Sequence, residues 1–408
     1  MGGKKTVAHR LGDLCIILIS ACVLAILVEV GTRGVIRLGS DAWPATRAAK
    51  FDTELRGLLE LYRRHPYLNT SPREGQSVAA FGKQASFSSL GYRSPERGVE
   101  KPSGTTRILC AGGSTTFDIL SANDSKTWPW RMEEILRERG LDAEVFNAGF
   151  PGWTSLENLI SLSIRDLDLE PDIVVLYQGI NDLQPASHRP FDSQYERGHA
   201  DEAVRALGFD LQPLKWYERS LLVEKARELV VGKRDPWQRL QSPSAPDNAL
   251  TELPAEALET FERNIRSFVA VAIAGGSRVV LVTQPMRIRS EHVDADEAYL
   301  AQWILGLDPV AAPAELERFN TVLREVSMTG PASLADVAGQ VAWEERDFDD
   351  PMHFSPDGSA RMARIMVDAV EKILEERGGA MTESQWTLDP RIRTTTQNAR
   401  DRQADQGR

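Results

Sequence analysis

The sequence predicts an α/β protein with a central parallel sheet covered by helices on both faces. From Thr105 onwards, short apolar runs alternate with longer amphipathic stretches, which is the pattern of βαβ units. The apolar runs are continuous, as expected for strands buried on both faces, and Ile108-Leu109-Cys110-Ala111 is the clearest example. A hydrophobic content of 42% over 408 residues is ordinary for a globular core.

The elements follow in a regular order along the chain. The expected strands cover Arg107–Ala111, Glu144–Asn147, Asp172–Gln178 and Arg278–Thr283, with a weaker one near Ser333–Val337. Helices are expected at about 128–139, 155–168, 255–274, 314–328 and 360–377. Ser355-Pro356 marks the start of the last helix, because serine is a favoured N-cap and proline is tolerated in the first turn.

Three segments depart from this pattern. Residues 37–103 contain an amphipathic stretch and then a Ser/Gly-rich one, which we interpret as a juxtamembrane helix followed by a spacer or a small subdomain. Residues 185–254 form an insertion in the α/β domain of residues 104–377, and this insertion is a lid, a second membrane-facing element or a solvated elaboration. Residues 378–408 are polar and aperiodic, which predicts a disordered tail.

The N-terminal region carries an uncharged apolar run, Leu14 to Val28. This run covers only about 22 Å of helix, so we expect the membrane anchor to extend over residues 14–36, with Glu29 and Arg33 at the interface. A cleaved signal peptide, lipidation at Cys22 and a buried helix are the alternatives.

Basic residues before the run favour a cytoplasmic segment 1–13. We therefore expect a single-pass membrane protein whose α/β domain is extracytoplasmic, in the periplasm or on the outer face. A formal charge of −11 and the absence of a dense basic block argue against nucleic acid as a partner. The cysteines show no metal-binding spacing, and we expect neither a metal nor a cofactor.

Ser114 follows the first predicted strand, in the sequence "RILCAGGSTTF". This position is the carboxyl edge of the sheet, where open α/β folds place their ligand sites. The stretch matches neither a phosphate-binding glycine loop nor a GxSxG nucleophile elbow, since Thr116 stands at the second glycine of that motif. Ser114 is either a nucleophile on another kind of strand-to-turn element or part of a plain Gly-Gly-Ser turn.

A serine nucleophile needs a histidine to accept its proton. Among six histidines, His353 is the best placed, because it lies directly before the predicted last helix in "FDDPMHFSPDG". Asp350 lies three residues upstream, close enough for its carboxylate to reach Nδ1 of the ring and fix the tautomer. A surface turn is the alternative interpretation of this Asp-x-x-His.

Two further strand ends offer groups for an oxyanion hole. Gly149 follows the second strand in "NAGFPGW" and exposes a backbone N–H, while Asn181 follows the third strand in "YQGINDL" and offers a side-chain amide. Together with the N–H of Ser114, these donors could surround a developing oxyanion. Each motif taken alone is also compatible with an ordinary turn.

The four blocks "GGST", "NAG", "GIND" and "DPMH", in this order, resemble the SGNH hydrolases, also called GDSL-type esterases. The matched residues are Ser114, Gly149, Asn181, His353 and Asp350. The resemblance covers roughly residues 105–375, apart from the insertion. It implies a three-layer α/β/α flavodoxin-like fold, a shallow open site and ester or acyl-transfer chemistry without a metal. The N-terminal region is similar to membrane-anchored bacterial members.

One position departs from the family pattern, since Gly113 stands where the name-giving block has aspartate. A specifically lipolytic role is therefore less favoured. We expect a membrane-anchored serine esterase that acts on acyl esters, O-acetyl groups on envelope polysaccharides being the favoured class. The alternatives are an O-acyltransferase using the same residues and a non-catalytic glycan-binding module. Gln284 and Arg287, beyond the fourth strand, either contact substrate or lie on the surface.

Overall fold

The structure is a computed structural model of the chain. It describes residues 16–17, 19–33, 46–63, 65–68, 70–80, 82–195, 219–231, 249–287, 293–304 and 306–375. The chain forms two compact units, one of Met1–Gly57 with Asp210–Gln241 and one of Leu58–Phe209 with Ser242–Arg408. The predicted cytoplasmic segment 1–13 and polar tail 378–408 lie outside the described residues.

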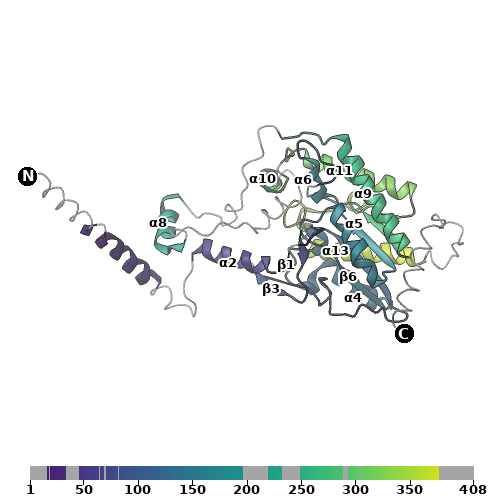
Figure 1. The fold of residues 1–408 in the computed structure, drawn as a ribbon, viewed down its shortest axis with the longest axis horizontal. Coiled ribbons are helices and arrows are strands. Elements are labelled where there is room, and N and C mark those ends of the chain that lie inside the picture. Colours follow the sequence, from purple (N-terminus) through teal and green to yellow (C-terminus); the bar gives the residue numbers. More distant parts are fainter. Residues whose placement is uncertain are drawn as a thin grey trace, which may run out of the picture. The chain divides into compact units, whose positions relative to one another are not determined.

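The larger unit is built around a five-stranded parallel sheet (Figure 1). The strands are β5 (Thr106–Gly112), β6 (Ala143–Asn147), β7 (Ile173–Tyr177), β8 (Arg278–Val282) and β9 (Ser333–Ala335). Their spatial order is β6-β5-β7-β8-β9, and each neighbouring pair is parallel. The carboxyl ends of all five strands therefore lie at one edge of the sheet.

Helices cover both faces of this sheet. One face carries α5 (Ser155–Ile164), α9 (Ala255–Ala274) and α11 (Ala312–Thr329), and the other carries α4 (Trp128–Glu138) and α13 (Pro356–Glu375). Successive residues of a strand point to opposite faces, so Leu109 and Ala111 pack with the first group while Ile108 and Cys110 pack with the second. The α/β class with a central parallel sheet is confirmed.

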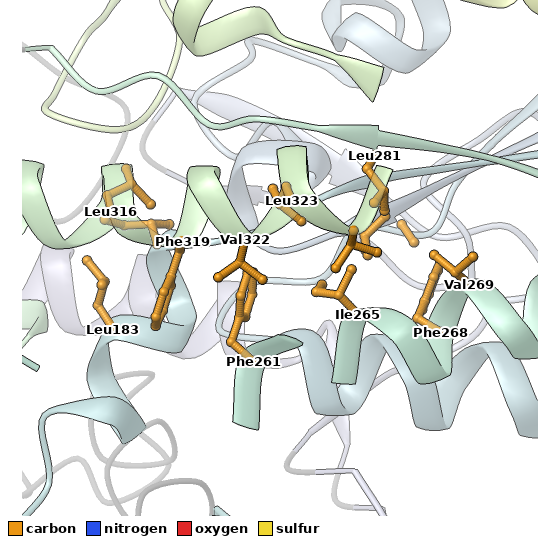
Figure 2. Close-up of a cluster of buried hydrophobic side chains, with 14 of the residues drawn as sticks. Leu183, Phe261, Ile265, Phe268, Val269, Leu281, Leu316, Phe319, Val322 and Leu323 are labelled. Atoms are coloured by element: carbon orange, nitrogen blue, oxygen red, sulfur yellow. The ribbon is translucent and has the colours of Figure 1, made fainter. Parts of the chain in front are cut away.

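The core on the α9 and α11 side is rich in aromatic and branched side chains. Phe261 of α9 and Phe319 of α11 stack with ring centroids 4.5 Å apart, and α9 and α11 run side by side along the sheet (Figures 1 and 2). In Figure 2, Leu281 of β8 points toward this helix pair, and its contacts join the sheet to the helical layer of α9 and α11. Apolar burial of this extent fixes the helices on the sheet.

Local signals place most element boundaries. All five strands form where they are expected, and α9 spans the expected range. Ser355 caps α13, because its Oγ accepts a hydrogen bond from the N–H of Gly358 at 3.2 Å. The predicted helix 155–168 is shorter than expected: α5 ends at Ile164, and Asp166–Leu169 form a 3-10 turn instead.

Part of the predicted spacer packs on the larger unit. Residues 62–86 form two small antiparallel pairs, β1 (Tyr62–Arg63) with β2 (Ser71–Pro72) and β3 (Ser77–Ala80) with β4 (Lys83–Ser86). A cluster of buried side chains joins this region to the sheet-edge loops. Its members are Leu61, Tyr62, Leu68, Phe87, Phe117, Phe150 and Trp153. The amphipathic stretch before it forms α2 (Arg47–Leu59), and its last residues enter β1.

The smaller unit contains the predicted anchor region. Residues 16, 17 and 19–33 of this region are described, and they are helical. Within the described ranges, no helix combines the length and the apolar character needed to cross a bilayer. The insertion contributes α8 (Leu221–Val231) to the same unit.

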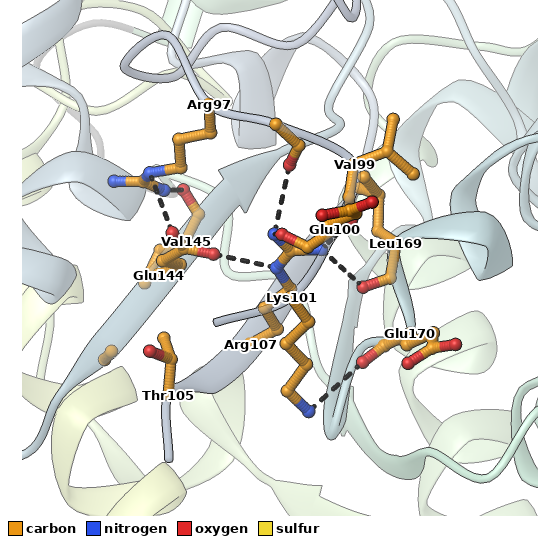
Figure 3. A network of polar contacts seen from close by, with 12 residues as sticks. Arg97, Val99, Glu100, Lys101, Thr105, Arg107, Glu144, Val145, Leu169 and Glu170 are labelled. Atoms are coloured by element: carbon orange, nitrogen blue, oxygen red, sulfur yellow. Dashed lines mark hydrogen bonds and ion pairs between the residues drawn. The ribbon is translucent and has the colours of Figure 1, made fainter. Parts of the chain in front are cut away.

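A buried arginine holds the amino end of β5. The side chain of Arg107 is about 1% exposed, and its Nε donates to Glu144 Oε2 at 2.7 Å. Its remaining N–H groups donate to main-chain carbonyls (Figure 3), namely those of Gly98, Val99, Glu100 and Leu169. The guanidinium therefore joins residues 98–100 to the first two strands.

We predict that Arg107→Ala lowers the free energy of unfolding by about 3–5 kcal/mol. The substitution removes the closer ion-pair partner of the Glu144 carboxylate, which keeps only Arg97 at 4.0 Å among the described residues, and it leaves four main-chain carbonyls without this donor. Chemical denaturation followed by circular dichroism measures the change. Arg266→Ala is the control, since it removes an exposed pair with Glu262 and should have little effect. Equal effects of the two substitutions would contradict the prediction.

Candidate active site

Ser114 lies at the carboxyl end of β5. The strand ends at Gly112, and the short helix α3 (Ser114–Phe117) begins at the serine. The N–H groups in the first turn of a helix have no partner within the helix, so the backbone N–H of Ser114 is a donor available to a ligand. Trp128 Nε1 donates to the carbonyl of Thr115 at 3.0 Å and holds α3 against α4.

The structure brings Ser114, His353 and Asp350 into one hydrogen-bonded chain. His353 Nε2 lies 2.8 Å from Ser114 Oγ, although 239 positions separate the two residues. On the other side of the ring, His353 Nδ1 lies 2.7 Å from Asp350 Oδ2. When Nδ1–H donates to the carboxylate, the lone pair of Nε2 faces the serine hydroxyl and can accept its proton.

Asp350 is held in its charged form. Burial alone would raise its pKa, but the His353 ring and the N–H groups of Met352 and His353 bring the pKa below its ordinary value. Both N–H groups donate to Asp350 Oδ1 at 2.9 Å, which leaves Oδ2 for the imidazole. The Asp-x-x-His spacing thus forms a turn in which the carboxylate faces both the backbone and the ring.

Contacts from other elements fix the loop that carries His353. The ring of Phe354 stacks on Tyr177 at the end of β7, with centroids 6.3 Å apart. The N–H of Arg287 donates to the carbonyl of Pro351 at 2.8 Å, and its guanidinium pairs with Asp296 at 2.5 Å. The side chain of Arg287 is only about 11% exposed, so it supports this loop and does not lie on the surface.

Asn181 is the third strand-end residue at this edge. Its Nδ2 donates to the carbonyl of Trp153 at 2.9 Å, which fixes the amide and leaves the second N–H of the group for another acceptor. A Cβ added to Gly113 would lie 2.2 Å from Asn181 Nδ2. The absence of a side chain at Gly113 therefore allows the amide to lie beside the start of α3.

The lack of a side chain at Gly149 allows close packing and does not serve to expose its N–H. A Cβ at this position would lie 2.3 Å from the backbone nitrogen of Phe117, so the loop after β6 packs directly on α3. The N–H of Gly149 donates to Asn147 Oδ1 at 3.0 Å. Sharing this N–H with a ligand oxygen requires a bifurcated hydrogen bond or a shift of Asn147.

Sequence analysis missed Lys83 and Asp182 near the site and assigned Gln284 a different environment. Gln284, expected to contact substrate or lie on the surface, is buried, and its Oε1 accepts a hydrogen bond from the N–H of Ile180 at 2.9 Å. Lys83 of β4 lies near Asp349 and Asp350, and burial lowers its pKa. The carboxylate of Asp182 accepts hydrogen bonds from Ser155, the first residue of α5. The "GIND" block was the one available signal for Asp182, while no signal in the spacer indicated Lys83.

The described part of the chain contains no group of three or more His, Cys, Asp or Glu side chains arranged to hold a metal ion.

Comparison with protein families identifies the chain. The model of the GDSL-like Lipase/Acylhydrolase family matches residues 110–361, which includes Ser114, Gly149, Asn181, Asp350 and His353. The chain belongs to this family. It is therefore an acylhydrolase, a member of a family of ester-hydrolysing enzymes. Among proteins of curated function, none matches the sequence significantly.

The acylhydrolase is also similar to solved structures, at low sequence identity. A lipase/acylhydrolase from Enterococcus faecalis is 15% identical, with coverage of 65% of this chain and 96% of that chain and a TM-score of 0.38. The acetyl xylan esterase AlAXEase is 15% identical, with coverage of 65% and 99% and a TM-score of 0.39. A putative lipolytic protein from Desulfitobacterium hafniense is 12% identical, with coverage of 64% and 98% and a TM-score of 0.37.

We predict that Gly113→Ala lowers kcat of the acylhydrolase by up to about 10²–10³-fold, the loss typical of one missing oxyanion donor, because the new Cβ displaces Asn181 Nδ2. Gly113→Asp should be at least as damaging. The measurement is steady-state hydrolysis of p-nitrophenyl acetate. In the control Gly57→Ala, the added Cβ meets no atom within 4 Å, and activity should be unchanged. A fully active Gly113→Ala enzyme would refute this role for the glycine.

Proposed function

We propose that this acylhydrolase is a serine esterase that works through a covalent acyl-serine intermediate. Ser114 is the nucleophile, His353 the general base and acid, and Asp350 the group that orients and stabilises the imidazolium. The N–H groups of Ser114 and Gly149 and the amide of Asn181 hold the oxyanion. The observation that supports these roles best is the chain of two short hydrogen bonds, 2.8 Å and 2.7 Å long, that joins the three side chains.

The steps balance without an added cofactor. Ser114 Oγ attacks the carbonyl carbon of the ester as its proton passes to His353 Nε2. The tetrahedral intermediate then collapses, the bond to the alcohol oxygen breaks, and His353 gives the proton to the leaving alcohol. Water repeats the sequence on the acyl-serine: it loses a proton to His353, releases the carboxylic acid, and the proton returns to Ser114.

We propose O-acetyl esters on cell-envelope glycans as the substrate class. The expected membrane attachment supports this choice, because it would confine the enzyme to substrates at the envelope. The Gly113 position supports it further, since the departure from the aspartate of the name-giving block weakens a lipolytic assignment.

The membrane attachment and extracytoplasmic location belong to the same proposal. Apolar side chains of the described helical residues 16, 17 and 19–30 are largely exposed, for example Ile16 at 64% and Leu27 at 62%, and such a surface suits a lipid environment. Near the end of this apolar stretch, Glu29 accepts hydrogen bonds from the N–H groups of Leu221 and Leu222 at the start of α8, each at 2.8 Å. Part of the insertion is therefore bonded to the expected anchor.

We predict that a fluorophosphonate probe labels the wild-type enzyme and that Ser114→Ala abolishes both the labelling and the hydrolysis of p-nitrophenyl acetate. Asn181→Ala should reduce kcat about 10²–10³-fold with a much smaller change in KM. The matched control is Ser163→Ala, which removes an exposed hydroxyl on α5. Retained hydrolysis in Ser114→Ala would rule out the acyl-serine scheme.

A second assay distinguishes water from an alcohol as the acyl acceptor. An O-acetylated polysaccharide serves as donor, and a labelled oligosaccharide serves as acceptor. Release of acetate without labelled product supports the esterase. Acceptor-dependent transfer of acetyl to the oligosaccharide would instead establish an O-acyltransferase, and a catalytically inactive protein that binds the polysaccharide would establish a glycan-binding module.

We predict that the full-length protein requires detergent for extraction from membranes and that Leu24→Arg with Leu27→Arg moves it to the soluble fraction. Each arginine at the centre of a membrane helix costs about 2.5–3.5 kcal/mol of insertion free energy. Val310→Arg, at an exposed position of the larger unit, is the control. If the double variant and the control fractionate alike, the anchor proposal is wrong.

A further inference from the structure

Asp182 is a fully buried carboxylate directly after Asn181, and the proposed chemistry leaves it without a role. It is 0% exposed and lies in the 3-10 turn Ile180–Asp182 that follows β7. Its Oδ1 accepts a hydrogen bond from Ser155 Oγ at 2.5 Å, and its Oδ2 accepts one from Gln178 Nε2 at 2.7 Å. The N–H of Ser155 lies 3.0–3.1 Å from the two oxygens.

These contacts connect two loops that follow different strands. Ser155 is the first residue of α5, at the end of the loop that follows β6 and carries Gly149. Asp182 belongs to the loop that follows β7 and carries Asn181. The carboxylate therefore bridges the two loops that hold two of the three proposed oxyanion donors.

A second connection runs through the carbonyl of Trp153, in the loop after β6. This oxygen accepts hydrogen bonds from Asn181 Nδ2 at 2.9 Å and from Gln178 Nε2 at 3.1 Å. Gln178 Nε2 thus serves both Asp182 and the carbonyl that orients the Asn181 amide. Loss of the hydrogen bond between Asp182 and Gln178 would therefore also disturb the carbonyl that orients the Asn181 amide.

The partners of Asp182 favour a charged carboxylate. The N–H and Oγ of Ser155 and Nε2 of Gln178 all act as donors toward it, and the Tyr195 hydroxyl lies 3.5 Å from Oδ1. Ser155 Oγ in turn accepts from Asn264 Nδ2 at 3.0 Å, which directs the serine proton toward Asp182. A protonated carboxyl would bring an additional donor into this set, and at least one of these hydrogen bonds would be lost.

No cation offsets the charge among these partners. Of the charged and titratable groups in the described surroundings, Glu157 of α5 carries the same sign and Tyr195 is neutral, while Arg263 of α9 donates to Asn264 Oδ1 and the carbonyl of Ser193. Burial accordingly raises the pKa of Asp182 to about 6, against the lowering effect of its Ser155 and Gln178 donors.

We propose that Asp182 is a positioning residue that ties the two loops of the oxyanion hole to each other, and that it does so only as a carboxylate. The proposal rests on the acyl-serine function given above. Asp182 does not touch the substrate, and it acts through Gln178, Trp153 and Asn181. Protonation of Asp182 loosens the Asn181 amide and lowers turnover, independently of the proton on His353.

The test compares wild type with Asp182→Asn in the full-length protein, using p-nitrophenyl acetate between pH 5 and pH 8.5. At pH 8, Asp182→Asn should lower kcat by about 10–100-fold, a part of the loss expected for a missing oxyanion donor, with KM changed less than about threefold. The ratio of wild-type to variant kcat should shrink towards one below about pH 6, because protonated Asp182 resembles asparagine in charge. Ser114, His353 and Asp350 are the same in both proteins, so their contribution to the pH dependence cancels in this ratio.

Thermal unfolding separates positioning from support of the fold. Because the folded-state pKa of Asp182 is raised, the folded protein binds more protons than the unfolded chain between about pH 4 and 6, and its stability falls as pH rises through that window. Above pH 6 the carboxylate is a stability cost, so the melting temperature of Asp182→Asn at pH 8 should equal or exceed that of wild type. Asp168→Asn, an exposed acid on the 3-10 turn after α5, is the matched control and should change neither measurement.

A second variant keeps the proposal testable if Asp182→Asn does not fold. Gln178→Met removes the donor shared by Asp182 and Trp153, and it should lower kcat with little change in KM. Unchanged kcat in this variant would overturn the proposal.

Two results with Asp182→Asn would also overturn the proposal. One is a ratio of wild-type to variant kcat that is constant across pH. The other is a fall in kcat accompanied by a rise in KM of similar size and by a lower melting temperature. In each of these cases the wild type still hydrolyses the ester and Ser114 is still labelled, so the acyl-serine function stands. An inactive wild type in which Ser114 is not labelled would remove both proposals.

Discussion

The parallel order of the strands is the constraint on which the candidate site depends. Because β5, β6 and β7 are adjacent and point the same way, the residues that follow them meet at one edge of the sheet. Ser114, Gly149 and Asn181 occupy those positions, and the loop before α13 adds His353. Residues far apart in the sequence come within hydrogen-bonding reach without a local motif to join them.

Buried charges at the two ends of the sheet have opposite surroundings. At the amino end, Arg107 is paired with Glu144 and its donors are satisfied by carbonyls, so the charge supports the fold. At the carboxyl end, Asp182 is surrounded by neutral donors and lacks a paired cation among the described residues. A buried charge without a cation lowers the stability of the fold. Such a loss of stability is expected where function requires a fixed arrangement of polar groups.

The sequence predicted the elements well because their signals are local. Continuous apolar runs identified the strands, and the Ser355-Pro356 pair identified the start of α13. The order of strand ends was enough to nominate Ser114, His353 and Asp350, which the structure joins by hydrogen bonds. The extent of α5 was wrong, because the chain turns at Arg165 into a 3-10 segment that no periodicity indicated.

The features that sequence analysis missed depend on tertiary contacts. Gly113 was noted only as a departure from the family block, whereas its reason is the close approach of the Asn181 amide. Gly149 was assigned an exposed N–H, but the structure shows that its lack of a side chain allows α3 to pack against it and that its N–H is bonded to Asn147. Such reasons follow from distances between loops, which the spacing along the chain does not contain.

The region ahead of the sheet has a practical consequence for any shortened form of the enzyme. Phe87 packs on Phe117, the last residue of the helix that begins at Ser114, and Trp153 Nε1 donates to the carbonyl of Thr70. A polypeptide that starts at residue 104, where the predicted α/β domain begins, would lack these partners and would expose the helix that carries the nucleophile to solvent. The smallest fragment worth purifying for crystallisation or kinetics therefore begins upstream of Leu61.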